Sequence, residues 1–240
     1  MPKSKRAKVV HLSKTEKKGK ELNQNLFANI RSAADTHQHI FVFAVSNMRN
    51  TYLKDVRAQF ADSRFFFGKT KVMAKALGSG PEDEHLPNLH KLSKYLTGNV
   101  GLLFTDREPA EVLEYFGNYT ETDFARAGTS ATQDFVVPAG VVYSRGGELA
   151  PDEDEPVPHS VETTLRKWGM PTRLDKGKVM LDEEYVVCRE GKELNSHQTA
   201  LLKMFGVATA EFRVKIVAYW SAAGQEVTVV GEGGVVDGSE

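Results

Sequence analysis

Apolar residues fall into two kinds of pattern along the first half of this 240-residue chain. The run HIFVFA at residues 39–44 continues into Val45, is β-branched and aromatic, and ends at a turn-like Ser-Asn pair, so it predicts a buried strand. Shorter runs at 64–67 and 100–104 predict two more strands. Apolar residues with helical spacing predict helices between them, over 50–60, 71–77, 86–96 and 108–119. Strands that alternate with helices are typical of an α/β layer fold.

A further helix is predicted near the N-terminus. Its apolar positions repeat every four residues, at Leu22, Leu26, Ile30 and Ala34. Ser13, with Glu16 three residues later, matches a capping box, so we expect the helix to begin near Ser13. Its apolar stripe should face a core, and its basic first turns should face solvent or a polyanion.

The pattern changes after Gly128. Residues 129–158 are rich in Gly, Pro and acidic side chains and contain one predicted strand, at 135–137. Further elements follow: a helix at 161–168, strands at 178–181 and 185–187, a helix at 197–205 and a strand at 211–220. We therefore predict an α/β domain interrupted by a smaller inserted α+β domain. The expected boundaries are a basic arm at 1–20, the α/β domain at 21–128 and 207–226, the insertion at 129–206, and a Gly-rich, acidic, mobile tail at 227–240.

Composition restricts the class of protein. A hydrophobic fraction of 40% beside 26% charged residues is ordinary for a soluble, folded protein. Cys188 is the single cysteine, so no intrachain disulfide can form, and a reducing compartment is favoured. The N-terminus is charged where a signal peptide would be apolar, and no later apolar run approaches the length of a membrane span. We therefore expect no membrane partner.

Charge is distributed unevenly, although the net charge is only −1. Residues 1–20 contain eight basic side chains and one acidic one, whereas residues 148–155 contain five acidic side chains and no basic one. A compact basic arm of this kind suits a nuclear import receptor or a nucleic acid. The arm therefore favours a nuclear protein that contacts a polyanion.

The sequence Gly68-Lys69-Thr70 resembles the end of a phosphate-binding loop. That motif requires a glycine five residues before Gly68, and Ser63 occupies this position. Without the glycine, the turn that cradles the phosphates is not assured. Nucleotide hydrolysis is therefore disfavoured, and we expect Lys69 to be one cation in a strand-to-helix loop.

Other catalytic and metal sites are not predicted. The seven histidines are scattered, and the pairs at 37/39 and 85/90 lack cysteine or carboxylate partners at ligand spacing. Cys188 ends an apolar strand without an evident histidine partner, so we expect a buried structural thiol. We predict no catalytic residue, no metal and no cofactor.

Basic and amide side chains do gather at the loops between predicted elements. Because the carboxyl ends of parallel strands meet at one edge of a sheet, we expect the loops after Val45, Phe67 and Phe104 to form one basic surface. Helix N-termini would donate backbone N–H groups to phosphates, and glycines would admit the RNA backbone closely. The alternative is an ordinary solvated charged face. The candidate RNA-binding residues are Lys5, Arg6, Lys14, Lys17, Lys18, Asn47, Arg49, Asn50, Gly68, Lys69, Lys71, Lys75, Gly98 and Asn99.

Several motifs resemble one known family. They are FFFGKTKVMAKALG, LTGNVGLLFTDREPAEV, FARAG, GMPTRLDKGKVML and NSHQTALLKMFGV, in order along nearly the whole chain. This set resembles the ribosomal stalk-base proteins, the archaeal and eukaryotic relatives of bacterial ribosomal protein L-ten. The opening residues, YSRGGEL and EFRVKIVAYW resemble a nucleolar branch of that family.

The resemblance implies a function as well as a fold. It implies an α/β domain with an insertion that binds large-subunit rRNA at the GTPase-associated centre, beside the neighbouring ribosomal protein L-eleven. Gly68, Lys69, Lys71 and Lys75 match the family's RNA-contacting stretch, and Gly98-Asn99 match its Gly-Asn-Val-Gly loop. The family usually has Asn-Thr after Gly-Lys, where this chain has Thr70-Lys71.

A second departure concerns the C-terminal region. Stalk-base proteins continue beyond their last strand with helices that recruit acidic stalk proteins, whereas this chain ends about twenty residues after Trp220. The resemblance therefore implies a placeholder that binds rRNA in nuclear pre-60S particles and later gives way to the stalk-base protein. It also implies residence in the nucleus and nucleolus, with shuttling to the cytoplasm on pre-60S particles left open, and a phosphatase-like release factor. The alternatives are a permanent ribosomal protein and a nucleotide-hydrolysing enzyme.

Overall fold

The structure, a computed structural model, describes residues 19–231 and 234–236. The chain forms two compact units. The first consists of the described residues of Met1–Val42, Ser63–Asp106 and Val217–Glu240, and the second consists of Phe43–Asp62 and Arg107–Ile216.

The largest sheet has two nearly fully buried strands in its middle, β1 (His39–Ser46) and β3 (Val100–Thr105). Strands covered on both faces read as continuous apolar runs, which is why the sequence pattern located both of them correctly. The strand order is β12-β11-β10-β1-β3-β2, with β4 (Thr120–Asp123) paired to β10. The remaining bounds are β2 Arg64–Phe66, β10 Ala210–Ser221, β11 Glu226–Gly231 and β12 Gly234–Val236.

The direction of β2 differs from the expected one. β2 pairs antiparallel with β3, with Arg64 opposite Phe104 and Phe66 opposite Leu102. The expectation that the loops after β1, β2 and β3 gather at one edge assumed parallel strands, and it was wrong for β2 and β3. In an antiparallel pair, the loop that follows one strand lies beside the start of its partner.

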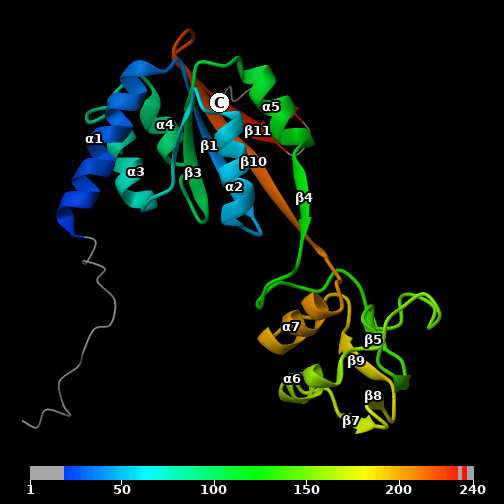
Figure 1. The fold of residues 1–240 in the computed structure, drawn as a ribbon. Coiled ribbons are helices and arrows are strands. Elements are labelled where there is room, and N and C mark those ends of the chain that lie inside the picture. Colours follow the sequence, from blue (N-terminus) through cyan, green and yellow to red (C-terminus); the bar gives the residue numbers. More distant parts are fainter. Residues whose placement is uncertain (1–18, 232–233, 237–240) are drawn as a thin grey trace, which may run out of the picture. The chain divides into compact units, whose positions relative to one another are not determined.

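Three helices belong to the first unit: α1 (Lys20–Thr36), α3 (Thr70–Leu77) and α4 (Leu89–Ser93). Figure 1 shows them gathered on one side of β1 and β3, and α3 packs against both α1 and α4. Each helix turns its buried residues to one face, as helical spacing predicts: Ile30, Ala33 and Ala34 in α1, and Met73, Ala76 and Leu77 in α3. The apolar stripe predicted for α1 was wrong at Leu22, which is 52% exposed. The capping box predicted at Ser13 and Glu16 lies outside the described residues.

Helix α4 is shorter than predicted. The apolar spacing indicated a helix over 86–96, but α4 begins at Leu89 and ends at Ser93. Asn88, its N-cap residue, has a left-handed backbone with φ of 62°, and Pro87 disfavours a helical conformation in Leu86. The helix therefore cannot begin before Leu89.

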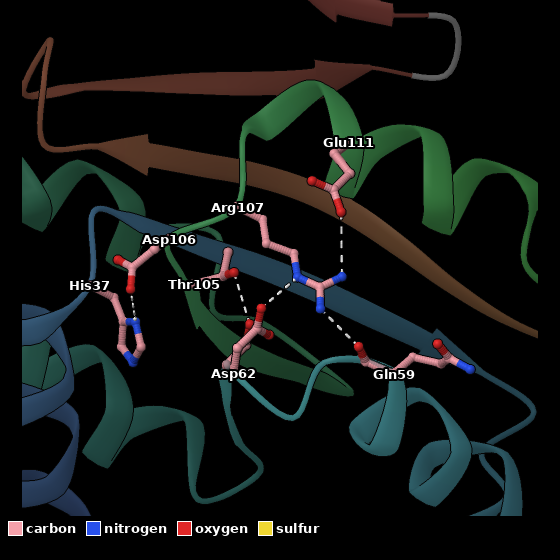
Figure 2. Close-up of polar contacts among 8 residues, drawn as sticks. His37, Gln59, Asp62, Thr105, Asp106, Arg107 and Glu111 are labelled. Atoms are coloured by element: carbon pink, nitrogen blue, oxygen red, sulfur yellow. Dashed lines mark hydrogen bonds and ion pairs between the residues drawn. The ribbon is translucent and has the colours of Figure 1, made fainter.

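The second unit contains α2 (Asn50–Gln59) and α5 (Pro109–Asn118), which are joined by aromatic packing. The Phe60 ring at the end of α2 stacks on Phe116 of α5 with centroids 5.4 Å apart. Arg107 adds polar contacts at this junction: its guanidinium donates to Asp62 Oδ2 at 2.9 Å and to the Gln59 carbonyl at 2.9 Å (Figure 2). The hydrogen bond to Asp62 raises the pKa of Arg107. Arg107 thus ties the end of α2 to the start of α5.

The part of the second unit between residues 125 and 210 has its own apolar core, which includes Phe135, Leu165, Val187 and Phe205. Its strands form two small antiparallel sheets, and it has short helices, so the predicted α+β insertion is confirmed. One sheet pairs β5 (Phe135–Val137) with β9 (Tyr185–Cys188), and the other has β6 (Gly140–Val141), β8 (Lys178–Leu181) and β7 (Thr172–Asp175). The helices are η2 His159–Val161, α6 Glu162–Lys167 and α7 Ser196–Met204.

Two further outcomes concern Cys188 and the C-terminal region. Cys188 is buried, as expected, and burial raises the pKa of its thiol. Residues 226–231 form strand β11 against β10, so the mobile tail predicted from residue 227 was wrong for these residues. Their sequence, EVTVVG, has four β-branched residues, which is typical of a strand, and their backbone pairs with the neighbouring strand β10. Within the described ranges, no helix combines the length and the apolarity needed to span a membrane.

Candidate nucleic-acid interface

The antiparallel pairing of β2 and β3 brings two of the predicted RNA-contacting loops to the same end of the sheet. Phe66 lies opposite Leu102, so the residues after Phe66 run toward the residues before Val100. Gly68 and Lys69 follow β2, and Gly98 and Asn99 precede β3. All four are exposed. The antiparallel pairing therefore places the Gly-Lys loop, which follows β2, beside the Gly-Asn loop, which precedes β3.

Helix α3 begins directly after the Gly-Lys loop and adds two lysines. Lys69 is the N-cap residue of α3, and Lys71 and Lys75 are exposed on consecutive turns of this helix. Residues four apart lie on the same face of a helix. Lys71 and Lys75 can therefore contact neighbouring phosphates of one RNA strand.

A groove of about 410 Å³ lies between α1 and α3, and it was not predicted. Two half-buried apolar side chains, Phe27 and Val72, contribute to its lining. The residues that line it are Lys20, Asn23, Gln24 and Phe27 from α1, and Lys71, Val72 and Lys75 from α3. We call it the α1–α3 groove. It adds Lys20, which was predicted only as part of the basic arm, to the basic surface.

The Phe27 ring contacts Arg31, a residue one turn further along α1. The guanidinium carbon of Arg31 lies 4.5 Å from the centroid of the Phe27 ring, which is cation–π distance. Arg31 Nε also donates a hydrogen bond to the Ala76 carbonyl of α3 at 3.1 Å. Arg31 thereby fixes the ring and links the two helices. No local signal in the sequence indicates this arrangement, because it depends on the contact between α1 and α3.

The two candidate glycines have different roles. A Cβ atom on Gly68 would lie 2.4 Å from Leu26 Cδ2 of α1, so the space beside Gly68 is used for helix packing. The expectation that Gly68 admits the RNA backbone therefore lacks support, because Leu26 occupies that space. Gly98 has φ of +75°, and no described atom lies within 4 Å of the position that a Cβ would take there, so its surface is open.

The candidates around α2 belong to the other unit and are engaged within it. Arg49 forms an ion pair with Asp123 at 2.5 Å and donates a hydrogen bond to the Phe124 carbonyl at 2.7 Å. Asn47 Nδ2 donates to the Glu211 carbonyl at 2.9 Å. Asn50 is exposed at the first position of α2. Asn47 and Arg49 thus hold the neighbourhood of β4 and β10 together, which a reading of loop composition could not reveal.

Five candidates from the basic arm lie outside the described residues: Lys5, Arg6, Lys14, Lys17 and Lys18. Their contribution to RNA binding stays a prediction.

The surroundings of Lys69 differ from those of a phosphate-binding loop. Ser63, which stands where that motif requires glycine, donates its hydroxyl hydrogen to Thr105 Oγ1 at 2.8 Å. The side chain of Ser63 is therefore part of the packing between the start of β2 and the end of β3. In the described part of the chain, no group of three or more His, Cys, Asp or Glu side chains has the arrangement of a metal site.

Comparison with known proteins gives a consistent result along the chain. Residues 18–121 match the family "Ribosomal protein L10", and residues 125–207 match the insertion domain of the 60S ribosomal proteins of that family. The ribosome assembly factor mrt4 of Neurospora crassa is 55% identical over 95% of this chain and 93% of its own length. The factor of the same name from Schizosaccharomyces pombe is 49% identical over 95% and 94%. The large ribosomal subunit protein uL10 of Methanopyrus kandleri is 22% identical over 85% of this chain and 54% of its own length.

Proposed function

The chain belongs to the ribosomal protein L10 family, in the group of the ribosome assembly factors mrt4, and from this membership we propose that it binds large-subunit rRNA at the stalk base of pre-60S particles. In this proposal it is a placeholder, which the stalk-base ribosomal protein replaces later. The interface is the basic surface of the first unit, formed by the Gly-Lys loop, α3, the Gly98-Asn99 loop and the first turns of α1.

The observation that carries the proposal is the concentration of lysines around one open loop. Lys69, Lys71 and Lys75 are exposed within seven residues of chain, and Gly98-Asn99 lies at the same end of the sheet. Phosphate contacts need cations that can reach the RNA backbone and a surface without obstructing side chains. Asn47, Arg49 and Asn50 have a secondary part in this proposal, because two of them are engaged within the chain.

Sequence identity favours an assembly factor over a permanent ribosomal protein. Identity to the two fungal assembly factors is 49–55%, against 22% to the archaeal uL10. The chain also spans more than nine tenths of the two assembly factors, but about half of that uL10. In this proposal the part shared with uL10 is the part that binds rRNA, so this chain occupies the rRNA site before uL10 arrives.

The proposal includes partners and domain boundaries. The partners are the pre-60S particle, the neighbouring ribosomal protein L-eleven and a phosphatase-like release factor. We propose that the insertion comprises 129–206 and that the α/β domain comprises 21–128 and 207–231, since β11 pairs with β10. No catalytic residue, metal or cofactor takes part in this function.

Co-sedimentation with ribosomal particles tests the proposed function. The tagged protein should sediment with nuclear pre-60S particles and be absent from polysomes, because the placeholder leaves before translation. A fluorescent fusion should concentrate in the nucleolus. Detection in polysomes, or a cytoplasmic signal that persists when nuclear export is blocked, would contradict the placeholder role and favour a permanent ribosomal protein.

Lys69→Ala separates RNA binding from nucleotide hydrolysis. The purified protein should hydrolyse neither ATP nor GTP above the buffer rate, and the variant should bind RNA more weakly without changing that rate. Phosphate release and RNA binding can be measured on the same samples. Hydrolysis by the unmodified protein that Lys69→Ala abolishes would instead support the enzyme alternative.

Gly98→Ala tests the open loop. Because Gly98 has φ of +75°, alanine there should lower the free energy of unfolding by about 1 kcal/mol. It should also weaken RNA binding, since the methyl group and the strained backbone obstruct close approach, while the salt dependence of binding stays the same. Binding is measured by fluorescence anisotropy at several salt concentrations.

Gly191→Ala is the matched control. Gly191 has the same φ of +75° and equally open surroundings, but it lies in the second unit. The control should lose similar stability and keep its RNA affinity. Equal losses of RNA affinity in the two variants would contradict a specific role for the Gly98 loop.

A further inference from the structure

The α1–α3 groove has features that phosphate binding does not need. Its lysines, Lys20, Lys71 and Lys75, suit phosphates, but Phe27 and Val72 are apolar. Asn23 and Gln24 add two side-chain amides, each of which offers both donors and an acceptor. An RNA duplex presents phosphates and hydroxyls at its surface, and it keeps its bases stacked inside.

We propose that the α1–α3 groove binds a single unpaired nucleotide of the RNA, with its base packed against the Phe27 ring. This inference rests on the proposed RNA-binding function and specifies the kind of RNA. The ligand is RNA with an unstacked base in a loop, bulge or junction, and continuous duplex lacks the group that the groove holds.

The Phe27 ring suits a stacking platform because it is already fixed. It is half-buried, lines the groove and contacts the Arg31 guanidinium, which is itself tied to the Ala76 carbonyl. Proteins that recognise unpaired RNA stack bases on aromatic side chains and on arginine planes. A fixed ring loses little conformational entropy when the base binds.

The size and polarity of the groove fit one nucleotide. Its volume of about 410 Å³ lies within the range of roughly 300–1,000 Å³ that is usual for sites of small organic ligands. Asn23 and Gln24 can form hydrogen bonds with the edge of a base, and the lysines can contact its flanking phosphates. None of the seven described residues that line the groove is acidic, so no carboxylate among them repels the phosphates.

An acidic peptide is the competing occupant. It would also be attracted by the three lysines, and its apolar side chains could contact Phe27 and Val72. Binding of such a peptide would not require an aromatic ring at position 27, because any apolar side chain of similar volume could contact the peptide. Phe27→Leu distinguishes the two occupants, since leucine keeps an apolar surface and removes the aromatic face.

The experiment uses the full-length protein and two RNA hairpins of equal length, one with an unpaired 2-aminopurine in its loop and one with this base paired in the stem. The unmodified protein should bind the first hairpin more tightly and quench its fluorescence, because the base stacks on Phe27. Phe27→Leu should weaken that binding about 5- to 20-fold, abolish the quenching and leave the salt dependence unchanged, since no charge is removed.

Leu22→Ala is the matched control, because Leu22 is an exposed apolar residue of α1 that does not line the groove. It should leave affinity and quenching unchanged, and circular dichroism should be the same for all variants. Unchanged RNA binding and quenching in Phe27→Leu would overturn the inference, as would an acidic peptide with apolar side chains that binds the unmodified protein and the variant equally and displaces the RNA. If Lys71→Ala also left RNA affinity unchanged, the proposed function itself would fail, so the two failures are distinguishable.

Discussion

Replacing Lys69, Lys71 and Lys75 together with alanine is expected to weaken binding to rRNA about 100-fold at 0.15 M salt. Each lysine that contacts a phosphate releases counterions from the RNA, and the slope of log K against log salt falls by about 0.7 to 0.9 for each contact. At 0.15 M salt this corresponds to roughly 0.6 to 0.7 logarithmic units of affinity per lysine. The three side chains are exposed, so their removal leaves the core intact.

The measurement is a salt titration of binding to an rRNA fragment of the GTPase-associated centre. If about five phosphates are contacted, the unmodified protein should give a slope near −3 to −5, and the triple variant should give a slope smaller in magnitude by about 2 to 3. An unrelated hairpin tests whether binding is specific for this rRNA.

A second triple variant, with Lys167, Lys178 and Lys192 replaced by alanine, is the matched control. These lysines are also exposed, but they lie in the second unit, and their loss changes the net charge equally. Affinity should change little. Equal losses in the two triple variants, or a slope near zero for the unmodified protein, would show that the lysines of α3 form no specific RNA surface.

Trp220→Ala is expected to lower the free energy of unfolding of the first unit by about 3 to 5 kcal/mol. Trp220, in β10, is only 2% exposed, so alanine would leave a large cavity. The indole Nε1 also donates a hydrogen bond to the Pro87 carbonyl at 3.0 Å, just before α4. Loss of that donor leaves a part-buried carbonyl without this partner, which adds to the cost.

Trp220→Phe separates the two contributions. Phenylalanine keeps most of the apolar volume and removes the N–H donor, so this variant should lose about 1 to 2 kcal/mol. Urea unfolding followed by far-ultraviolet circular dichroism gives the overall change, and amide hydrogen exchange in β3 reports the first unit separately. A Trp220→Ala variant that unfolds at the same urea concentration as the unmodified protein would contradict this account of the β10–α4 contact.

The apolar pattern was sufficient to locate the strands and helices that are buried in the structure. β1 and β3 are nearly continuous apolar runs, and β10 alternates buried and exposed residues as its sequence predicts. These elements are visible locally because burial on one or both faces leaves a period of two or an unbroken run. The family resemblance, which is confirmed by the comparisons, was likewise carried by short motifs.

A polar strand could not be recognised in the same way. β4 has the sequence TETD, without any apolar residue, and it exists because its backbone pairs with residues 210–213 of β10. β11, by contrast, has the sequence EVTVVG, whose β-branched residues are typical of a strand, and it pairs with its neighbour β10, so the missing local signal concerns β4. Backbone hydrogen bonds to a distant strand leave no trace in the local pattern of side chains.

Some residues of the candidate interface could be identified from the sequence, and others only from the tertiary structure. The lysines of the Gly-Lys stretch were identified from the order of residues, because charge and loop position are local properties. The partners of Gly68 and Arg49, the antiparallel direction of β2 and the placement of Phe27 beside α3 required the tertiary structure. Each of these is a contact between segments far apart in the chain, and the free energy of such a contact is set by the geometry of the whole domain rather than by neighbouring residues.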